Sequence, residues 1–381
     1  MLKNKKKIVL AYTADVSAIL ITGQVKYFQD KGYEVSIITK VGEKTNALIE
    51  REGGVAYSIN FEREISILKD IKSLFLSIRL LNQIKPDIVN AGTPKASLIL
   101  MTASWFLRVP TRIYTCRGFR FETELGMKRF VLKTLEKICG VFAHKIVCIS
   151  PSLKELAVNE NIFKQEKTLV LGKGSSNGIS LEKFSRAKLN DLKLHEIISD
   201  YNINKDYFTI GFAGRLHPDK GLKELFSAYD ILKLKHPFIQ LLLVGSLESD
   251  EIEKELEYRK QDKNLIYVGF QNAIEYFIAN FNVLVLPSYR EGFGNVLIQA
   301  AALGVPTITN NVTGCKDAVL DNFNGFIVPK NDVNGLVEKI NLLIEDKMLQ
   351  KKMGENGITF SKQFGSKTIW QELEILYQKK F

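Results

Sequence analysis

The sequence has few of the residues that metal centres and disulfide frameworks require. Its 381 residues include only four cysteines and four histidines. The cysteines, at positions 116, 139, 148 and 315, are scattered, and none has the short pairwise spacing of a zinc site. Scattered single cysteines are typical of a reducing compartment. We therefore expect no metal site and no disulfide.

Long apolar runs are also missing. The basic N-terminal segment is followed by a short apolar run at 8–12, which ends before Asp15. Such a run is too short for a signal-peptide core or a membrane-spanning helix. Hydrophobic residues make up 45% of the chain and charged residues 25%, as in ordinary globular proteins. This composition predicts a cytoplasmic protein.

The charge is unevenly distributed. Residues 1–180 contain 28 Lys and Arg against 16 Asp and Glu, so they carry the whole excess behind the net charge of +11. Within 108–145, nine basic and three acidic residues alternate with aromatic ones. The phenylalanines in or beside this stretch are Phe106, Phe119, Phe121, Phe130 and Phe142. Together they favour peripheral docking on the anionic cytoplasmic face of the inner membrane, although a core helix with a solvated basic face explains them equally well. No nucleic-acid-binding motif accompanies the charge, so we expect no nucleic acid partner.

Short apolar runs alternate with amphipathic segments along the whole chain. The runs of the first half are 7–13, 34–39, 86–91, 111–115, 145–150 and 168–172, and those of the second half are 207–214, 238–245, 265–270, 283–287, 306–310 and 325–329. Intervening segments such as 65–84 and 126–143 have helical length and periodicity. Alternating strands and helices predict the α/β class with parallel sheets.

The length and the two series predict two domains. We expect an N-terminal domain at 1–180, a C-terminal domain at 181–365, and a C-terminal helix at 366–381 that returns to the first domain. The charged, strandless stretch 181–206 is expected to link the domains. Two doubly wound, Rossmann-like domains facing a cleft would place ligands at the carboxyl ends of the strands.

The first candidate anion site follows the run 207–214. Arg215 comes directly after Gly214, and Lys220 precedes the next helical segment. A guanidinium binds phosphate oxygens with two donors and an ammonium acts as a compact charge, so the pair suits a diphosphate. A surface ion pair at Arg215 and a solvated Lys220 remain the alternative.

The second candidate is the glycine-rich loop after the run 283–287. Glu291, Gly292, Phe293, Gly294 and Asn295 lead into a helical segment. A loop of this kind presents unpaired backbone N–H groups to an anion. A plain turn with Asn295 as the helix cap is the alternative. Glu291 would repel phosphate unless it faces hydroxyl groups.

A resemblance rests on these motifs taken together. They are GFAGRLHPDKG, LLLVGS, YVGF, LPSYREGFGNVLIQAAALGVPTITNNVTG and GFIVP in the second half, and NAGTPKASLI, RIYTCRGFR, AHKIVCISPS and GKGSSNGISLEKF in the first. The set resembles the large retaining glycosyltransferase family of GT-B fold that is numbered four, and within it bacterial members that build O-antigen or capsule. The resemblance implies a metal-independent hexosyltransferase without a cofactor. Its donor would be a nucleoside-diphosphate sugar, carrying a UDP-linked hexose or N-acetylhexosamine, and its acceptor a polyprenyl-pyrophosphate-linked glycan.

The resemblance also assigns donor-site roles. Arg215 and Lys220 would bind the donor diphosphate, and Glu291 the hydroxyls of the donor sugar. The family has a second glutamate eight positions later, for the ribose, where this chain has Gln299. The remaining expected donor-site residues are Gly214, Gly245, Gly269, Phe270, Gly292, Phe293, Gly294 and, through their backbone N–H groups, Asn295, Val296 and Leu297.

The first half supplies candidates for the acceptor side. Asp15 is expected to orient an acceptor hydroxyl or to cap the helix that follows it. Thr93 and Lys95 are expected to meet an acceptor phosphate. Arg117 cannot act as a base, because a guanidinium stays protonated, but it would bind a lipid pyrophosphate. His144 precedes its strand and is expected to be structural.

Two other functions remain open from the sequence. A nucleotide-sugar epimerase of GT-B type would share the phosphate-binding residues but would need acidic groups near the sugar. A catalytically weak, membrane-docked assembly partner is the other, and Gln299 is its only indication.

Overall fold

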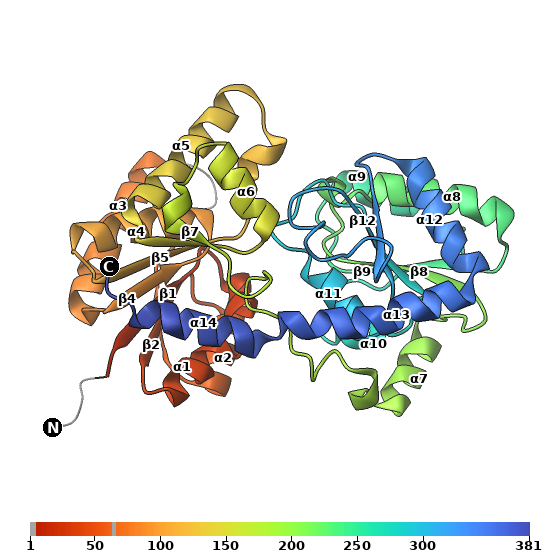
Figure 1. The fold of residues 1–381 in the computed structure, drawn as a ribbon, viewed down its shortest axis with the longest axis horizontal. Coiled ribbons are helices and arrows are strands. Elements are labelled where there is room, and N and C mark those ends of the chain that lie inside the picture. The colour runs from red at the N-terminus through yellow and green to blue at the C-terminus, as the bar shows by residue number, and fades with distance from the viewer. Residues whose placement is uncertain (1–4, 63–65) are drawn as a thin grey trace. The chain divides into compact units, whose positions relative to one another are not determined.

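The computed structural model describes residues 5–62 and 66–381 (Figure 1). The chain forms two compact units, one made of residues 1–178 and 366–381 and the other of 179–365. The helix expected at 65–84 is observed as α3, Ile67–Ile84, and Ile65 lies outside the described residues. None of the described helices combines the length and the apolar character needed to span a bilayer.

The first unit is built on a seven-stranded parallel sheet with the strand order β3-β2-β1-β4-β5-β6-β7. The strands are β1 Lys7–Ala11, β2 Glu34–Thr39, β3 Val55–Ser58, β4 Ile88–Ala91, β5 Thr111–Cys116, β6 Lys145–Cys148 and β7 Thr168–Leu169. The edge strand β3 is the one that the apolar runs did not predict. Its residues are half-buried or exposed, so its sequence carries no buried apolar run.

Helices cover both faces of this sheet. The helices are α1 Gln24–Asp30, α2 Glu43–Glu52, α3, α4 Pro94–Phe106, α5 Gly126–Phe142, α6 Pro151–Asn159 and α14 Ser366–Gln378, with short 3-10 turns at Asp15–Ile21, Arg120–Thr123 and Gln165–Lys167. Helices α3, α4 and α5 lie together on one face, and α1, α2 and α14 on the other (Figure 1). This division follows from right-handed crossovers that run outward from β1 in both directions.

Helix α14 completes the core of the first unit, although it comes from the end of the chain. Its Leu373, Leu376 and Tyr377 are buried against β1, β2 and Phe28 of α1. The Asn90 amide donates to the Tyr377 hydroxyl at 2.6 Å, which fixes the helix to β4.

The second unit has a six-stranded parallel sheet with the order β10-β9-β8-β11-β12-β13. Its strands are β8 Phe208–Ala213, β9 Ile239–Val244, β10 Leu265–Tyr267, β11 Val283–Leu286, β12 Thr307–Asn310 and β13 Gly325–Val328. Its helices are α7 Asp191–Asp200, α8 Leu222–Lys235, α9 Asp250–Tyr258, α10 Ile274–Ile278, α11 Asn295–Ala302, α12 Val333–Glu345 and α13 Lys347–Ser361, with 3-10 turns at Arg186–Lys188, Pro218–Lys220 and Lys362–Phe364.

The stretch 181–206, expected as a linker, belongs to the second unit and carries α7. Arg186 anchors it: its guanidinium donates to the carbonyls of Leu303 at 2.8 Å and Ala279 at 2.7 Å. Its buried apolar residues, Phe184, Ile197 and Ile203, are widely spaced and form no apolar run, which is why the charged sequence resembled a linker.

Candidate active site

The two loops predicted to bind an anion lie side by side in the second unit. They follow β8 and β11, which are neighbours in the sheet, so both loops leave the same sheet edge. The Tyr289 N–H donates to the Asp219 carbonyl at 2.9 Å. Gly221 has a φ of +71°, and a Cβ there would lie 2.0 Å from the Pro287 carbonyl oxygen. Only glycine allows this approach.

Lys220 and Glu291 form an ion pair at the centre of this arrangement. The Lys220 Nζ lies 2.7 Å from the Glu291 Oε1, and the two side chains are only 10% and 19% exposed. The Ser288 hydroxyl lies 3.1 Å from the same oxygen. An ammonium has three donors and Glu291 takes one, so Lys220 retains donors for a ligand oxygen. The structure thus brings together the expected phosphate-binding and sugar-binding residues.

Arg215 is oriented by two carboxylates. Its guanidinium lies 2.9 Å from Glu248, in the loop after β9, and 3.7 Å from Asp219. Burial alone would raise the pKa of Asp219, but the cations of Lys220 and Arg215 and the hydrogen bond from His217 bring it below its usual value. Asp219 is therefore an anion that organises the cations around it, and these include Arg290 of the other loop at 3.7 Å.

Neither Asp219 nor Glu248 was singled out from the sequence. Asp219 could have been recognised as a partner of these cations, because it lies between Arg215 and Lys220 in one loop. Glu248 had none, since only the pairing of β8 with β9 places it beside Arg215.

The third loop of the site follows β12 and contacts the segment that leads into α11. The Gly294 N–H donates to the Gly314 carbonyl at 3.2 Å. Gly294, rather than Asn295, occupies the position before the helix, so the expected alternative of an Asn295 cap is wrong. The N–H groups of Asn295 and Leu297 donate to loop carbonyls, and among the described residues Val296 is the one of these three whose N–H has no such acceptor.

The other predicted donor residues divide into two kinds. The side chains of Phe293 and Leu297 are buried, and the Phe293 ring packs 5.5 Å from Phe364, so only their backbone can face a ligand. Gln299 is half-buried on α11, and Phe270 is exposed. Gly245 and Gly269 follow the neighbouring strands β9 and β10, and the Gly245 N–H donates to the Gly269 carbonyl at 2.9 Å. Gly214 lies in the loop after β8, and Gly292 lies in the loop after β11.

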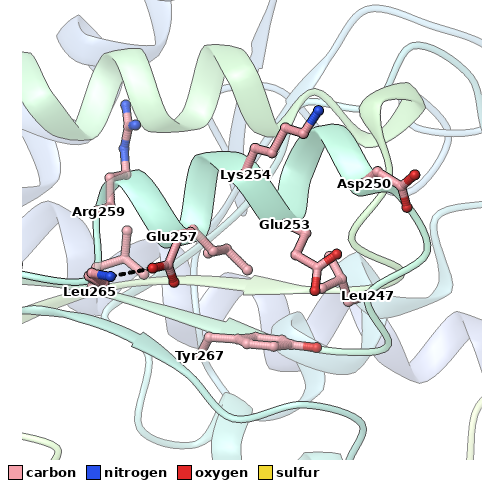
Figure 2. Close-up of a pocket in the computed structure, with 10 residues that line it drawn as sticks. Leu247, Asp250, Glu253, Lys254, Glu257, Arg259, Leu265 and Tyr267 are labelled. Atoms are coloured by element: carbon pink, nitrogen blue, oxygen red, sulfur yellow. Dashed lines mark hydrogen bonds and ion pairs between the residues drawn. The ribbon is translucent and has the colours of Figure 1, made fainter.

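An open hollow of about 870 Å³ lies elsewhere in this unit, between α9 and β10 (Figure 2). Asp250 and Glu253 of α9 and Tyr267 of β10 border it, and Glu257 is paired with Lys260. None of the predicted site residues lines this hollow.

Asp15, the first acceptor-side candidate, caps a helix distant in sequence. Its carboxylate accepts hydrogen bonds from the N–H groups of Gly42 and Lys44, both at 3.0 Å, and of Thr45 at 2.8 Å, and from the Thr45 hydroxyl at 2.6 Å. These groups lie at the start of α2. Asp15 therefore caps α2 and not the helical segment directly after it, so the expected capping of that segment is wrong. Burial alone would raise the pKa of Asp15, but the hydrogen bonds to its carboxylate outweigh this effect and lower the pKa below its usual value.

The remaining acceptor-side candidates lie after β4 and β5, and each has a partner within the first unit. The Thr13 N–H donates to the Thr93 hydroxyl at 2.8 Å, and Lys95 pairs with Asp70 at 2.6 Å. The Arg117 guanidinium donates to the Ser176 hydroxyl and the Gly92 carbonyl, both at 2.6 Å, and lies over the Tyr12 ring. Their contacts with an acceptor stay predictions.

Two further expectations concern the basic stretch 108–145. Burial, with the cations of Arg112 and Lys167, lowers the pKa of His144 to about 4, so this histidine is neutral at pH 7. Phe119 and Phe121 are buried and stack on each other, whereas Phe130 and the neighbouring Phe106 are exposed. Only part of the basic and aromatic stretch therefore faces solvent.

Comparison with known proteins identifies the family. Residues 195–360 match the model described as "Glycosyl transferases group 1", and residues 9–150 match "Glycosyl transferase 4-like". The capsular polysaccharide biosynthesis glycosyltransferase CapM of Staphylococcus aureus is 41% identical over 99% of this chain and 97% of its own length. This chain is a GT-B glycosyltransferase of the family-four type.

Two other relatives carry more specific names. An Escherichia coli UDP-Gal:alpha-D-GlcNAc-diphosphoundecaprenol alpha-1,3-galactosyltransferase is 30% identical over 75% of this glycosyltransferase and 74% of its own length. A Campylobacter jejuni N,N'-diacetylbacillosaminyl-diphospho-undecaprenol alpha-1,3-N-acetylgalactosaminyltransferase is 27% identical over 93% of both chains.

Solved structures share the whole fold. A glycosyltransferase from Rickettsia africae superposes with a TM-score of 0.81 at 18% identity, covering 98% of both chains. Anabaena HepE in complex with UDP-glucose gives 0.80 at 18% identity, covering 97% of this glycosyltransferase and 98% of its own chain. A Neisseria meningitidis UDP-GlcNAc 2-epimerase gives 0.67 at 16% identity, covering 97% and 99%. The fold alone therefore does not separate transfer from epimerisation.

Proposed function

We propose that this glycosyltransferase moves a hexose or N-acetylhexosamine from a UDP-sugar to a polyprenyl-diphosphate-linked glycan, with retention of anomeric configuration. The product would serve capsule, O-antigen or related surface polysaccharide synthesis. The names of the relatives that act on diphosphoundecaprenol-linked acceptors support the acceptor class, and that of CapM supports the pathway.

The observation that carries the proposal is the cluster of cations at one sheet edge. Arg215 and Lys220 lie on one loop, and the adjoining loop leads to the start of α11 with the Val296 N–H. Preorganised charges aimed at a leaving group are commonly the largest single contribution to catalysis. Here they would stabilise the departing nucleoside diphosphate, and the reaction needs no metal ion in this scheme.

The proposed step is balanced without a protein base. The acceptor oxygen bonds to the anomeric carbon on the face from which the diphosphate leaves, as the bond to the diphosphate oxygen breaks. The acceptor proton passes to a leaving phosphate oxygen. Glu291, held by Lys220 and Ser288, would hold hydroxyls of the donor sugar.

The first unit would place the enzyme at the cytoplasmic face of the inner membrane. The exposed Phe106 and Phe130 and the basic residues of 108–145 support this proposal. Cosedimentation with anionic vesicles, and not with neutral ones, is the expected result; equal binding to both would contradict it.

The decisive experiment replaces both cations. Arg215→Ala with Lys220→Ala should lower the release of nucleoside diphosphate in the presence of a lipid-diphosphate acceptor by at least about a hundredfold. Lys223→Ala, which replaces an exposed lysine in the first turn of α8, is the matched control and should keep full activity. Arg215→Ala alone, at a half-exposed position, keeps the test informative if the double variant misfolds.

Several outcomes would overturn the proposal. Full activity of the double variant would remove its basis. Interconversion of UDP-sugars without an acceptor would indicate an epimerase, and no reaction with any nucleotide sugar would indicate an assembly partner. The anomeric configuration of the product, determined by NMR, tests retention, and activity in excess EDTA tests metal independence.

A further inference from the structure

The first unit contains an apolar groove on the helix-covered face that α14 does not occupy. Helix α4 packs against both α3 and α5, and the groove lies over it with a volume of about 320 Å³. Each helix contributes residues spaced three or four apart, which form one face of a helix. They are Ile67, Asp70, Ile71 and Leu74 of α3, Lys95, Leu98, Ile99 and Thr102 of α4, and Leu132, Leu135, Glu136 and Cys139 of α5, with Pro94 and Arg120.

Three charged residues of the groove, Asp70, Lys95 and Arg120, lie near the carboxyl edge of the sheet. Lys95 lies in the first turn of α4, just after β4, and Arg120 follows β5. Lys95 pairs with Asp70, whereas Arg120 is exposed and, within the described residues, has no carboxylate partner. Apart from Thr102 and the buried Glu136, the groove is therefore apolar along its length, and it is cationic at the edge where the acceptor candidates Thr93 and Arg117 lie.

The apolar character continues outside the groove. Leu68 of α3 and Met127 and Phe130 of α5 are more than 65% exposed. Inside it, Glu136 is buried and receives a hydrogen bond from the Tyr114 hydroxyl at 2.6 Å. The hydrocarbon chain of a lipid in a bilayer could pass from these exposed apolar residues into the groove.

We propose that this groove binds the first isoprene units of the polyprenyl-diphosphate acceptor, with Arg120 and Lys95 at its mouth binding the diphosphate. The inference rests on the lipid-diphosphate acceptor proposed above and adds the site of its tail. The volume is at the lower end of small-molecule sites, so the groove takes the beginning of the chain and leaves the rest in the bilayer.

Binding of farnesyl diphosphate to the full chain, measured by titration calorimetry without any donor, tests the proposal. Leu74→Trp fills the groove and should weaken binding by about tenfold or more. Phe75→Trp, the next residue of α3 and outside the groove lining, should change it less than about twofold. Arg120→Gln should also weaken binding, while inorganic diphosphate should bind the wild type far more weakly than farnesyl diphosphate.

Ile71→Trp, at a half-exposed position of the lining, is the second filling variant if Leu74→Trp does not fold. The groove proposal is overturned if the wild type does not bind farnesyl diphosphate, if folded filling variants bind like wild type, or if Phe75→Trp weakens binding as much as Leu74→Trp. Because no donor is present, groove binding without any sugar transfer would count against the transferase reaction alone, and transfer without groove binding against the groove alone.

Discussion

Among single residues, the Lys220–Glu291 pair explains how a carboxylate occurs in a loop that is expected to bind phosphate. An unpaired carboxylate there would repel the donor diphosphate. With Nζ at 2.7 Å and Ser288 on the same oxygen, the charge of Glu291 is compensated and its orientation fixed. The carboxylate is then available for hydroxyl groups, which accords with its proposed contact to the sugar.

Gln299 gives a test of the ribose contact. An amide oxygen accepts a neutral hydrogen bond from a ribose hydroxyl, whereas a carboxylate accepts a stronger, charge-assisted one. Gln299→Glu should therefore tighten UDP binding by about 1 kcal/mol, or roughly fivefold. Isothermal titration with UDP measures the change, with Gln299→Ala as the control that should weaken binding. Unchanged affinity in both variants would show that position 299 does not meet the ribose.

The site residues differ in how far the sequence revealed them. The sequence singled out Arg215 and Lys220 because they are cations in a loop after an apolar strand, and the family resemblance gave Glu291 its role. The structure brings Lys220 and Glu291 together, and the contacts of all three residues with a donor stay predictions. Their partners could not be predicted in the same way. Glu248 reaches Arg215 from a different strand, and such a contact depends on strand order and not on local sequence.

At the level of secondary-structure elements, Asp15 links the loop after β1 to the start of α2. Four hydrogen bonds converge on its carboxylate, and three of them come from N–H groups that an isolated helix start would leave unpaired. The second role that we expected for Asp15, orienting an acceptor hydroxyl, would have to compete with these bonds.

Asp15→Ala should destabilise the first unit by about 1–2 kcal/mol, as other lost helix caps do. The pKa of Asp15 is lowered in the folded state, so the wild-type advantage should be present above the unfolded pKa of about 3.8 and disappear as the pH falls through the lower folded value. Urea unfolding can be followed by the fluorescence of Trp105 and Trp370, the chain's two tryptophans, both in this unit.

Asp30→Ala, which removes an exposed ion pair with Lys26, is the matched control and should change the stability little. Equal effects of the two substitutions would contradict the capping role. A variant Asp15→Asn that is stable but inactive would instead favour a contact with the acceptor.

Elements with a buried apolar run could be predicted from the sequence, and those without one could not. The runs that became β8, β9 and β11 are buried at nearly every position, which is the pattern of a parallel sheet covered on both faces. Strand β3 lies at the sheet edge with exposed residues, so pairing with β2 and not composition makes it a strand.

At the scale of the whole molecule, the stability of the first unit depends on α14, which comes from the far end of the sequence. Deleting residues 366–381 would uncover Phe28 and remove the buried Ile369, Leu373 and Tyr377. Each large buried side chain contributes about 2–5 kcal/mol, against a total of about 5–15 kcal/mol for a typical domain. The first unit should then become sensitive to protease while residues 179–365 remain resistant, as mass spectrometry of the fragments would show.

A chain ending at Gln378 is the control for this truncation, because the three residues removed are exposed. Resistance of the first unit in the shorter chain would show that its sheet is stable without α14.

The same helix sets an order for folding during synthesis. The ribosome makes β1 to β7 first, yet the side chains that close their core belong to α14, which is translated only after the whole second unit. Residues 179–365, by contrast, are contiguous and can fold before translation ends. The unit that is synthesised first is therefore completed after the second one, and part of its apolar sheet stays uncovered until α14 has left the ribosome.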